Sequence, residues 1–304
     1  MPERTDNVPQ PSRDHTGRRR HLARLAALLD DAREGRYAVG GFDFCNAETA
    51  QAIVEQGVAL RSPVLLSTGP WEMPLLGAEM LAAIADALAA RADVPVCLHL
   101  DHSTDVALIE ECVEAGFCSV MIDASRHDFE ENVRVTASVV EMAHARGVDV
   151  EAELGALGRV DDIAVEGGGA TSLTDPDLAA EFVRRTGVDA LAVAIGNAHG
   201  VYAQRPALDF DRLRAIRAAT DVALVLHGGS GTPPDQLHQA IAIGIVKVNV
   251  ASELSRGYLA ALAQASAGAD ARSWYAAALA DAKAAFGGIV AGWMRVLDSA
   301  GRAP

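Results

Sequence analysis

The sequence has few aromatic residues, which make up 5% of its 304 positions, and almost no lysine, which occurs only as Lys247 and Lys283. Few aromatics beside abundant alanine favour an α/β protein whose sheet is covered by helices over a β-sandwich. The chain also has fewer basic than acidic residues, and its formal net charge is −15 at pH 7. A nucleic acid or an anionic membrane needs a basic surface, so we expect neither as a partner. An anionic small molecule is not excluded, because a metal ion or backbone amides can reverse the field locally.

Disulfide and membrane signals are missing as well. The cysteines form no CxxC pair: Cys45, Cys97, Cys112 and Cys118. We therefore predict buried free thiols in a reducing compartment. No apolar run reaches the roughly 18 residues that a membrane span needs. Residues 1–20 are polar and lack the apolar centre of a signal peptide, so they predict a disordered tail before one domain at 21–304 of a cytoplasmic protein.

Short strand-type runs alternate with longer helical stretches. The eight runs are Tyr37–Asp43, Pro63–Ser67, Val96–Asp101, Ser119–Asp123, Val148–Glu153, Ala190–Ile195, Ala223–His227 and Ile245–Val250. Several are apolar nearly throughout, which is typical of parallel strands buried on both faces. The pattern predicts a (β/α)8 TIM barrel, with a short helix at His21–Glu34 before it and a helical extension after it. An open, doubly wound sheet is the alternative, and periodicity alone does not exclude it.

Polar residues at the ends of the runs favour the barrel. Five runs end in, or are followed by, such residues: Asp101 and His102; Glu151 and Glu153; His199; His227; and Asn249. The carboxyl ends of barrel strands meet at one mouth, which is where barrel enzymes place their chemistry. Three neutral imidazoles around an open fourth position are typical of a catalytic zinc site. We therefore predict that His102, His199 and His227 bind a metal. His99 lies one layer deeper and is expected to be a hydrogen-bonded core residue.

Small residues follow two of these histidines, and they predict a phosphate site. Gly200 follows His199, and Gly228, Gly229 and Ser230 follow His227. Glycines let backbone amides approach an anion, and the loops after strands seven and eight are the usual phosphate site of a barrel. Ser252 can add a hydroxyl at a helix N-terminus.

The longest loop is expected to act as a lid. It runs from Gly155 to Ser172, carries the acidic residues Asp161 and Asp162, and holds three glycines near its end. A loop of this length inside a compact domain usually has a functional role.

Taken together, the segments "LHLDHSTD", "VEAELG", "LVLHGGSG" and "IVKVNVASEL" resemble the class II aldolases. The resemblance runs from Tyr37 to Leu254 and is strongest to the tagatose-bisphosphate and fructose-bisphosphate aldolase branch. It implies zinc-dependent cleavage of a ketose phosphate such as fructose 1,6- or tagatose 1,6-bisphosphate. The products would be dihydroxyacetone phosphate and an aldehyde such as glyceraldehyde 3-phosphate.

The resemblance also implies roles for individual residues. His102, His199 and His227 match the metal ligands, and Glu153 matches an acidic residue that can replace one of them. Asp101 matches the acid/base for the substrate hydroxyl. The positions that hold the ketone-half phosphate and hydroxyls are matched by Gly200, Gly228, Gly229, Ser230, Asn249, Ala251 and Ser252. A monovalent cation, Na⁺ or K⁺, near that phosphate and a homodimer or homotetramer are also implied.

Several positions depart from the family pattern. Asp161 stands where the family has the Glu that acts as the second acid/base, and its side chain is one methylene shorter. Asp43 stands where the family has Asn, and Arg126 stands where it has His. These changes affect the side chains that would contact the far half of the substrate. They leave open which sugar is cleaved, including a deoxy-phosphogluconate.

Two other functions compete with metal-dependent cleavage. A Schiff-base aldolase would need no metal, and Lys247 lies on the eighth strand on the same face as Asn249. We instead interpret Lys247 as an inward lysine paired with a carboxylate, because the rival leaves three histidines unexplained. A noncatalytic partner subunit is the other rival, and the intact Asp101 and histidines argue against it.

Overall fold

The structure, a computed structural model, describes residues 21–157, 172–200, 206–267 and 274–304. Eight parallel strands pair in chain order, and β1 pairs with β8 to close a barrel. They are β1 (Val39–Asp43), β2 (Val64–Thr68), β3 (Val96–Ser103), β4 (Ser119–Ile122), β5 (Asp149–Leu154), β6 (Ala190–Val193), β7 (Ala223–Leu226) and β8 (Ile245–Val250). The predicted (β/α)8 barrel is confirmed. The open sheet is wrong, because closure leaves no edge strand.

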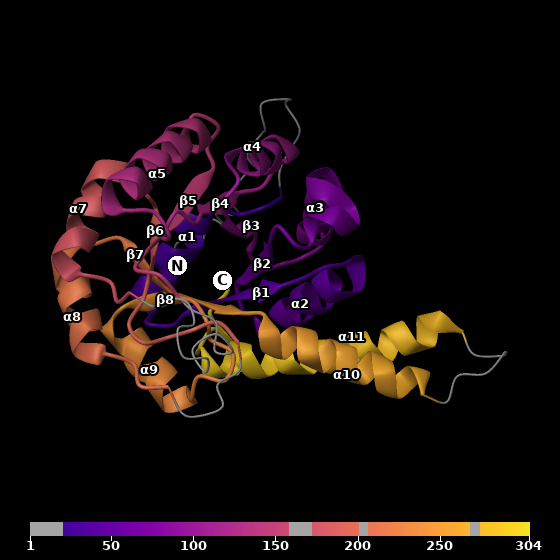
Figure 1. Cartoon of the computed structure of the whole chain (residues 1–304). Coiled ribbons are helices and arrows are strands. Elements are labelled where there is room, and N and C mark those ends of the chain that lie inside the picture. The colour runs from indigo at the N-terminus through magenta and orange to yellow at the C-terminus, as the bar shows by residue number, and fades with distance from the viewer. Residues whose placement is uncertain (1–20, 158–171, 201–205, 268–273) are drawn as a thin grey trace, which may run out of the picture.

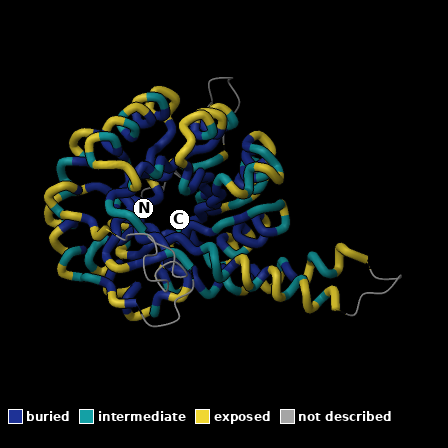
Figure 2. The backbone as a smooth tube through the Cα atoms, in the orientation of Figure 1, coloured by how far each residue is buried: buried dark blue, intermediate teal, exposed yellow. Residues whose placement is uncertain are grey.

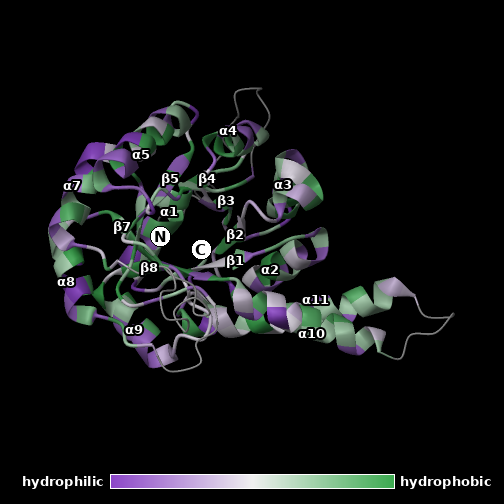
Figure 3. Cartoon of the chain, in the orientation of Figure 1, coloured by the Kyte–Doolittle hydropathy of each residue, from purple (hydrophilic) through white to green (hydrophobic). Residues whose placement is uncertain are grey.

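Helices surround the barrel on its outside (Figure 1). They are α2 (Ala47–Leu60), α3 (Met73–Ala89), α4 (Val106–Ala115), α5 (Phe129–His144), α7 (Pro176–Thr186), α8 (Phe210–Ala219) and α9 (Pro234–Ile243). Figure 2 shows the buried residues concentrated in the barrel and on the inward side of these helices. Figure 3 shows hydrophobic and hydrophilic residues alternating along the helices, as amphipathic helices on an apolar sheet require.

Helix α1 (Leu25–Gly35) covers the amino-terminal end of the barrel. Its buried Leu25, Leu28 and Leu29 pack in one cluster with side chains from inside the barrel, such as Leu65 of β2. Arg24 and the backbone N–H of Ala26 both donate to the buried carboxylate of Asp149, at the start of β5. This end of the barrel is thus filled, and the polar strand ends lie at the other end.

Helices α10 (Ser252–Ser266) and α11 (Tyr275–Val296) form the predicted helical extension. They pack against each other and project beyond the barrel as a hairpin (Figure 1). No helix within the described ranges is long and apolar enough to cross a membrane. All four cysteines are free, as predicted, but Cys45 is only half-buried because it lies at the mouth of the barrel.

Candidate active site

A pocket of about 880 Å³ opens at the carboxyl ends of the strands, and a bulge in β3 supplies two of its residues. The register between β3 and β4 shifts between Leu100 and Ser103, and His102 has a left-handed φ of 45°. Neighbouring residues of a regular strand point to opposite faces. The bulge redirects the chain, so that Asp101 and His102 both line the pocket.

The three predicted histidines lie together. The ring centroid of His102 is 4.6 Å from that of His199 and 4.4 Å from that of His227. One ring nitrogen from each of the three lies within 4.8 Å of the others. His102 Nε2 is buried and has no hydrogen-bond partner, and the buried His227 Nδ1 has only a contact with Glu153 Oε2 at 3.3 Å. An unpaired buried nitrogen is costly, and a metal ion would satisfy both atoms, so these residues fit the implied metal.

Carboxylates bond the second ring nitrogen of two of these histidines. His102 Nδ1 lies 3.1 Å from Asp123 Oδ2, and His227 Nε2 lies 2.8 Å from Glu151 Oε1. A metal-binding histidine usually bonds a carboxylate through its other nitrogen, which fixes the ring and its tautomer. The partner role of Asp123 was not predicted, although its place directly after an apolar strand was a usable signal.

The rings of His199 and His227 lie in different electrostatic surroundings. Burial, and then the positive charges of His102 and His227, lower the pKa of His199 to about 3. Burial opposes charge on His227 as well, but its bonds to Glu151 and Glu153 raise its pKa to about 10. The neighbouring carboxylates thus stabilise positive charge at His227, while burial favours a neutral His199. A metal ion shared by the rings matches both preferences.

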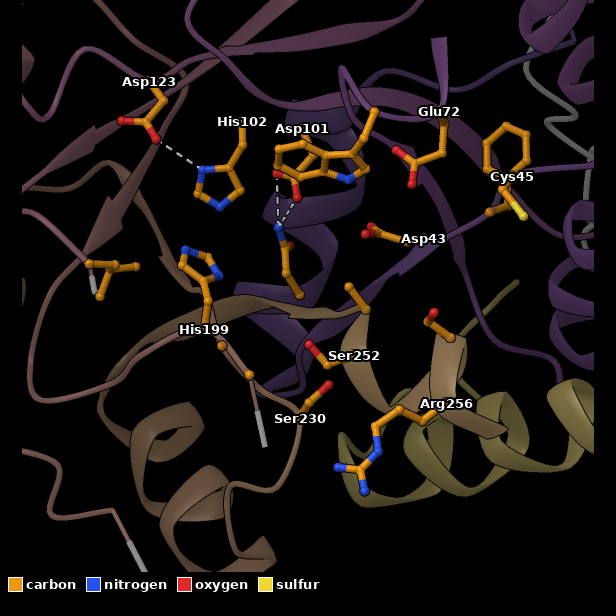
Figure 4. A pocket seen from close by; sticks show the side chains of 18 of the residues that line it. Asp43, Cys45, Glu72, Asp101, His102, Asp123, His199, Ser230, Ser252 and Arg256 are labelled. Carbon is orange, nitrogen blue, oxygen red and sulfur yellow. Dashed lines mark hydrogen bonds and ion pairs between the residues drawn. The ribbon is translucent and has the colours of Figure 1, made fainter. Parts of the chain in front are cut away.

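Asp101 is an ionised carboxylate beside this cluster. Burial opposes its ionisation, but the charge of His102 and a bond from His99 hold the pKa of Asp101 well below its usual range. Both of its oxygens accept from Asn249 Nδ2 at 2.9 Å. Figure 4 shows Asp101 close to His102. A charged carboxylate in this position can accept a substrate proton.

Lys247 lies below the pocket and not in its lining. Its Nζ is 2.6 Å from Glu151 Oε2 and 3.3 Å from His99 Nε2, and the side chains of all three residues are fully buried. His99 Nδ1 in turn lies 2.8 Å from Ser119 Oγ. The interpretations of Lys247 as a paired inward lysine and of His99 as a core residue are confirmed. Glu151, expected at the mouth, is instead part of this interior network.

The predicted phosphate site lies where β7 and β8 end. Gly228 approaches the backbone so closely that a Cβ there would lie 2.0 Å from Ala198 O, and its φ is 68°. The N–H of Glu253, in the first turn of α10, donates to Ser230 Oγ. The same pocket is lined by Gly200, Gly228, Ser230, Asn249, Ala251 and Ser252. A glycine loop beside a helix N-terminus is suited to an anion.

Gly229 has a packing role that differs from its neighbours. It does not line the pocket; its N–H donates to Asn249 O at 3.0 Å. A Cβ at this position would lie 2.5 Å from Val248 Cγ1. Gly229 therefore holds the β7 loop against β8.

Glu153 and the described ends of the long loop lie at the edge of the pocket. Glu153 Oε2 lies 3.3 Å from His227 Nδ1, and the carboxylate also groups with His102 and Asp123 as possible ligands. This placement fits the role of an alternative ligand. Ala156 pairs with Ser172, so the two ends of the loop are joined beside Glu153. Asp161 and Asp162 lie outside the described residues.

Several further lining residues were not singled out from the sequence, among them Trp71, Glu72 and Arg256. Trp71 and Glu72 follow β2, a strand whose end carries no histidine or carboxylate. Arg256 lies one turn into α10, so its relation to the mouth depends on the helix direction. No sequence pattern marks such positions before the barrel is assembled.

The comparisons with known proteins agree with this geometry. The profile of the class II fructose-bisphosphate aldolases matches residues 23–302, and the chain belongs to this family. The YdjI aldolase from Escherichia coli K12 is 33% identical, with a TM-score of 0.81, covering 93% of this chain and 100% of that one. A candidate fructose-1,6-bisphosphate aldolase from Coccidioides immitis is 31% identical, with a TM-score of 0.82 and coverages of 92% and 97%. The fructose-bisphosphate aldolase of Campylobacter jejuni, at 21% identity, a TM-score of 0.78 and coverages of 91% and 95%, shares the fold.

The chain is therefore an aldolase of the metal-dependent class, a carbon–carbon lyase on a TIM barrel.

Proposed function

We propose that the protein uses Zn²⁺ to cleave a ketose phosphate into dihydroxyacetone phosphate and an aldehyde. Fructose 1,6- and tagatose 1,6-bisphosphate are the first candidates, and with them the aldehyde is glyceraldehyde 3-phosphate. The observation that supports this most directly is the group of three histidine nitrogens within 4.8 Å of one another, with His102 Nε2 unpartnered, beside the ionised Asp101.

His102, His199 and His227 would hold the metal, with Glu153 as an alternative ligand. When bound, the ion supplies Lewis-acid stabilisation of the negative charge that develops on the ketone half. The site matches Zn²⁺, while Co²⁺ and Fe²⁺ are alternatives with similar ligand preferences.

The protein's own groups handle the protons and the phosphate. Asp101 accepts the proton of the hydroxyl on the aldehyde-side carbon of the bond that breaks, and Asn249 holds its carboxylate in place. As that hydroxyl becomes an aldehyde, the bonding electrons pass to the ketone half. A second acid then returns a proton to its carbon, and we propose Asp161 for this step. Gly228, Ser230 and the start of α10 bind the phosphate.

Neither rival explains the site as well. A Schiff-base mechanism needs an accessible amine, but Lys247 is fully buried and bonded to Glu151. A noncatalytic subunit has no need for Asp101 and three convergent histidines. Another substrate of the same class, such as a deoxy-phosphogluconate, is the alternative within this function.

We also propose that the protein forms a homodimer or homotetramer through the α10–α11 hairpin. Leu259 is 60% exposed there, and Trp274 and Tyr275 are each 68% exposed. Exposed apolar side chains gathered on one projection favour a protein interface. Light scattering after size-exclusion chromatography would test this, with Leu259→Glu as the disrupting variant. A bound Na⁺ or K⁺ beside the phosphate is a further proposal.

A cleavage screen tests the central proposal. Purified protein loaded with Zn²⁺ would be incubated with phosphorylated ketoses, and released dihydroxyacetone phosphate would be measured with a coupled dehydrogenase. Turnover of at least one ketose phosphate is expected. Turnover of none of them would contradict the proposal.

A further inference from the structure

The pocket wall formed by the ends of β1, β2 and β3 carries three carboxylates. Asp43 ends β1, Glu72 precedes α3, and Asp101 lies in the bulge of β3. Figure 4 shows the Asp43 side chain extending into the pocket between Asp101 and Glu72. The phosphate-binding loops, in contrast, follow β7 and β8.

Asp43 and Glu72 lack basic partners. Within the ranges that the structure describes, no ion pair joins Asp43 or Glu72 to a basic side chain. Asp43 Oδ1 is buried and has no hydrogen-bond partner, and the same holds for Asn249 Oδ1 in the same pocket. Unpaired buried acceptors favour a ligand that brings donors.

The electrostatic potential at this wall opposes further negative charge. Burial first, and then the charges of Asp101 and Glu72, raise the pKa of Asp43 well above its usual range. Burial raises the pKa of Glu72 as well, with a contribution from Asp101. A place where a single carboxylate charge is already disfavoured is worse for a phosphate dianion.

The arginines of the pocket stand elsewhere. Arg126 is exposed and follows β4, and Arg256 is exposed on α10. Figure 4 places Arg256 beside Ser230 and Ser252, where it adds positive charge to the phosphate site.

The proposed mechanism fixes the direction in which a substrate lies. Its phosphate is at the β7 and β8 loops, its carbonyl is at the metal, and Asp101 receives the next hydroxyl proton. The remaining carbons must continue past Asp101, away from the metal. Asp43 and Glu72 line the pocket on that side, close enough to Asp101 for its charge to act on both.

We propose that Asp43 and Glu72 select an aldehyde half that is uncharged and bears hydroxyl groups, so that the substrate is a ketose 1-phosphate whose far end carries no phosphate. The hydroxyls donate to Asp43 Oδ1 and Glu72. This inference rests on the proposed function, and within that function it disfavours the bisphosphates.

Condensation tests this selectivity directly. Dihydroxyacetone phosphate loses a proton from its hydroxymethyl carbon, that carbon bonds to the aldehyde carbon, and the aldehyde oxygen gains a proton. The Zn²⁺-loaded enzyme would be given racemic glyceraldehyde or racemic glyceraldehyde 3-phosphate, and kcat/KM compared. We expect a preference for glyceraldehyde of about tenfold or more, because like charges are rejected at a desolvated site. A preference for glyceraldehyde 3-phosphate would overturn the inference.

The variant Asp43→Asn sharpens the test. It keeps the shape and removes the ionisable carboxyl group, so the preference for glyceraldehyde should fall by about tenfold or more. Glu79→Gln, on the exposed face of α3, removes a carboxyl group outside the pocket and should leave the preference unchanged. An unchanged preference in Asp43→Asn would exclude Asp43 as the determinant and overturn the inference.

A second measurement separates the proposed function from the proposed selectivity for the aldehyde. Exchange of the hydroxymethyl carbon proton of dihydroxyacetone phosphate with solvent uses only the ketone half. We expect this exchange in the wild type and in Asp43→Asn, which also shows that the variant is folded. No exchange in the wild type would overturn the proposed function and the inference with it. Exchange accompanied by a preference for the phosphorylated aldehyde would overturn the inference alone.

Discussion

Both carboxylate oxygens of Asp101 lie 2.9 Å from the side-chain nitrogen of Asn249, across the mouth of the barrel from β3 to β8. The amide gives two bonds to a carboxylate that is already ionised. Asn249 thereby fixes the direction in which Asp101 can accept a proton. The bulge that places Asp101 also places His102, so the base and one metal ligand are held by the same backbone irregularity.

Replacing Asp101 by Asn should preserve the metal and abolish most turnover. The amide has nearly the same shape but cannot accept the hydroxyl proton, and the loss should be of the order of 10²-fold or more. Metal content by elemental analysis and kcat for the best substrate check this. Turnover near that of the wild type, or loss of the metal, would contradict the role given to Asp101.

Replacing Asp123 by Asn should weaken metal binding while leaving the fold intact. The amide can still contact His102 Nδ1, but it does not supply the negative charge that polarises the ring. Such outer partners typically contribute 10–100-fold, roughly, in metal affinity. Competition with a chromophoric chelator would measure it, with Glu79→Gln as the surface control. Equal affinity in both variants would remove Asp123 from the metal site.

Replacing Glu151 by Gln should destabilise the barrel strongly. Lys247 would keep a fully buried charge without its partner, which costs about 3–5 kcal/mol in comparable buried pairs. The double variant Glu151→Gln, Lys247→Met should lose less than the sum of the two single changes. Urea unfolding at neutral pH measures this, and strictly additive losses would show that the two residues are not coupled.

The Glu151 interaction should also depend on pH. Burial opposes its charge, but Lys247 and His227 lower its pKa to about 2. A lowered folded-state pKa adds stability that is present above the unfolded value of about 4.3 and is lost as the pH falls toward the folded value. The stability advantage of the wild type over Glu151→Gln should therefore shrink below about pH 4.3. Urea titrations at neutral pH and in mild acid would show it; a difference that grows in acid would contradict the assigned shift.

Much of the fold and the metal site could be predicted because the signals are local. The apolar runs marked the strands, and His102, His199 and His227 stood out because each occupies or follows a strand end where a packed core would place apolar residues. The ends of the strands are harder to predict than their presence. We expected β3 to end at Asp101, but it continues through the bulge to Ser103. A bulge depends on the register with the neighbouring strand, which a single strand does not reveal.

Pairings across the barrel could not be predicted. Glu151 and Glu153 alternate on one strand and both face inward, yet only depth decides that Glu151 joins Lys247 while Glu153 reaches the pocket. Asp123 is marked in the sequence as a polar strand end, but its pairing with His102 becomes recognisable only when β3 and β4 lie side by side. Gly229 shared a motif with the phosphate residues, but close packing on Val248 gives it a different role.

The central claim, a metal-dependent reaction without an imine, is tested most directly by one paired inactivation experiment. The enzyme would be assayed after thorough chelation, after restoring Zn²⁺ or Co²⁺, and after treatment with borohydride in the presence of substrate. We expect chelation to abolish cleavage, the metal to restore it, and borohydride to leave it intact, because three histidines hold the ion and Lys247 is bonded to Glu151. Activity that survives chelation and is lost with borohydride would contradict this account and identify Lys247 as the nucleophile.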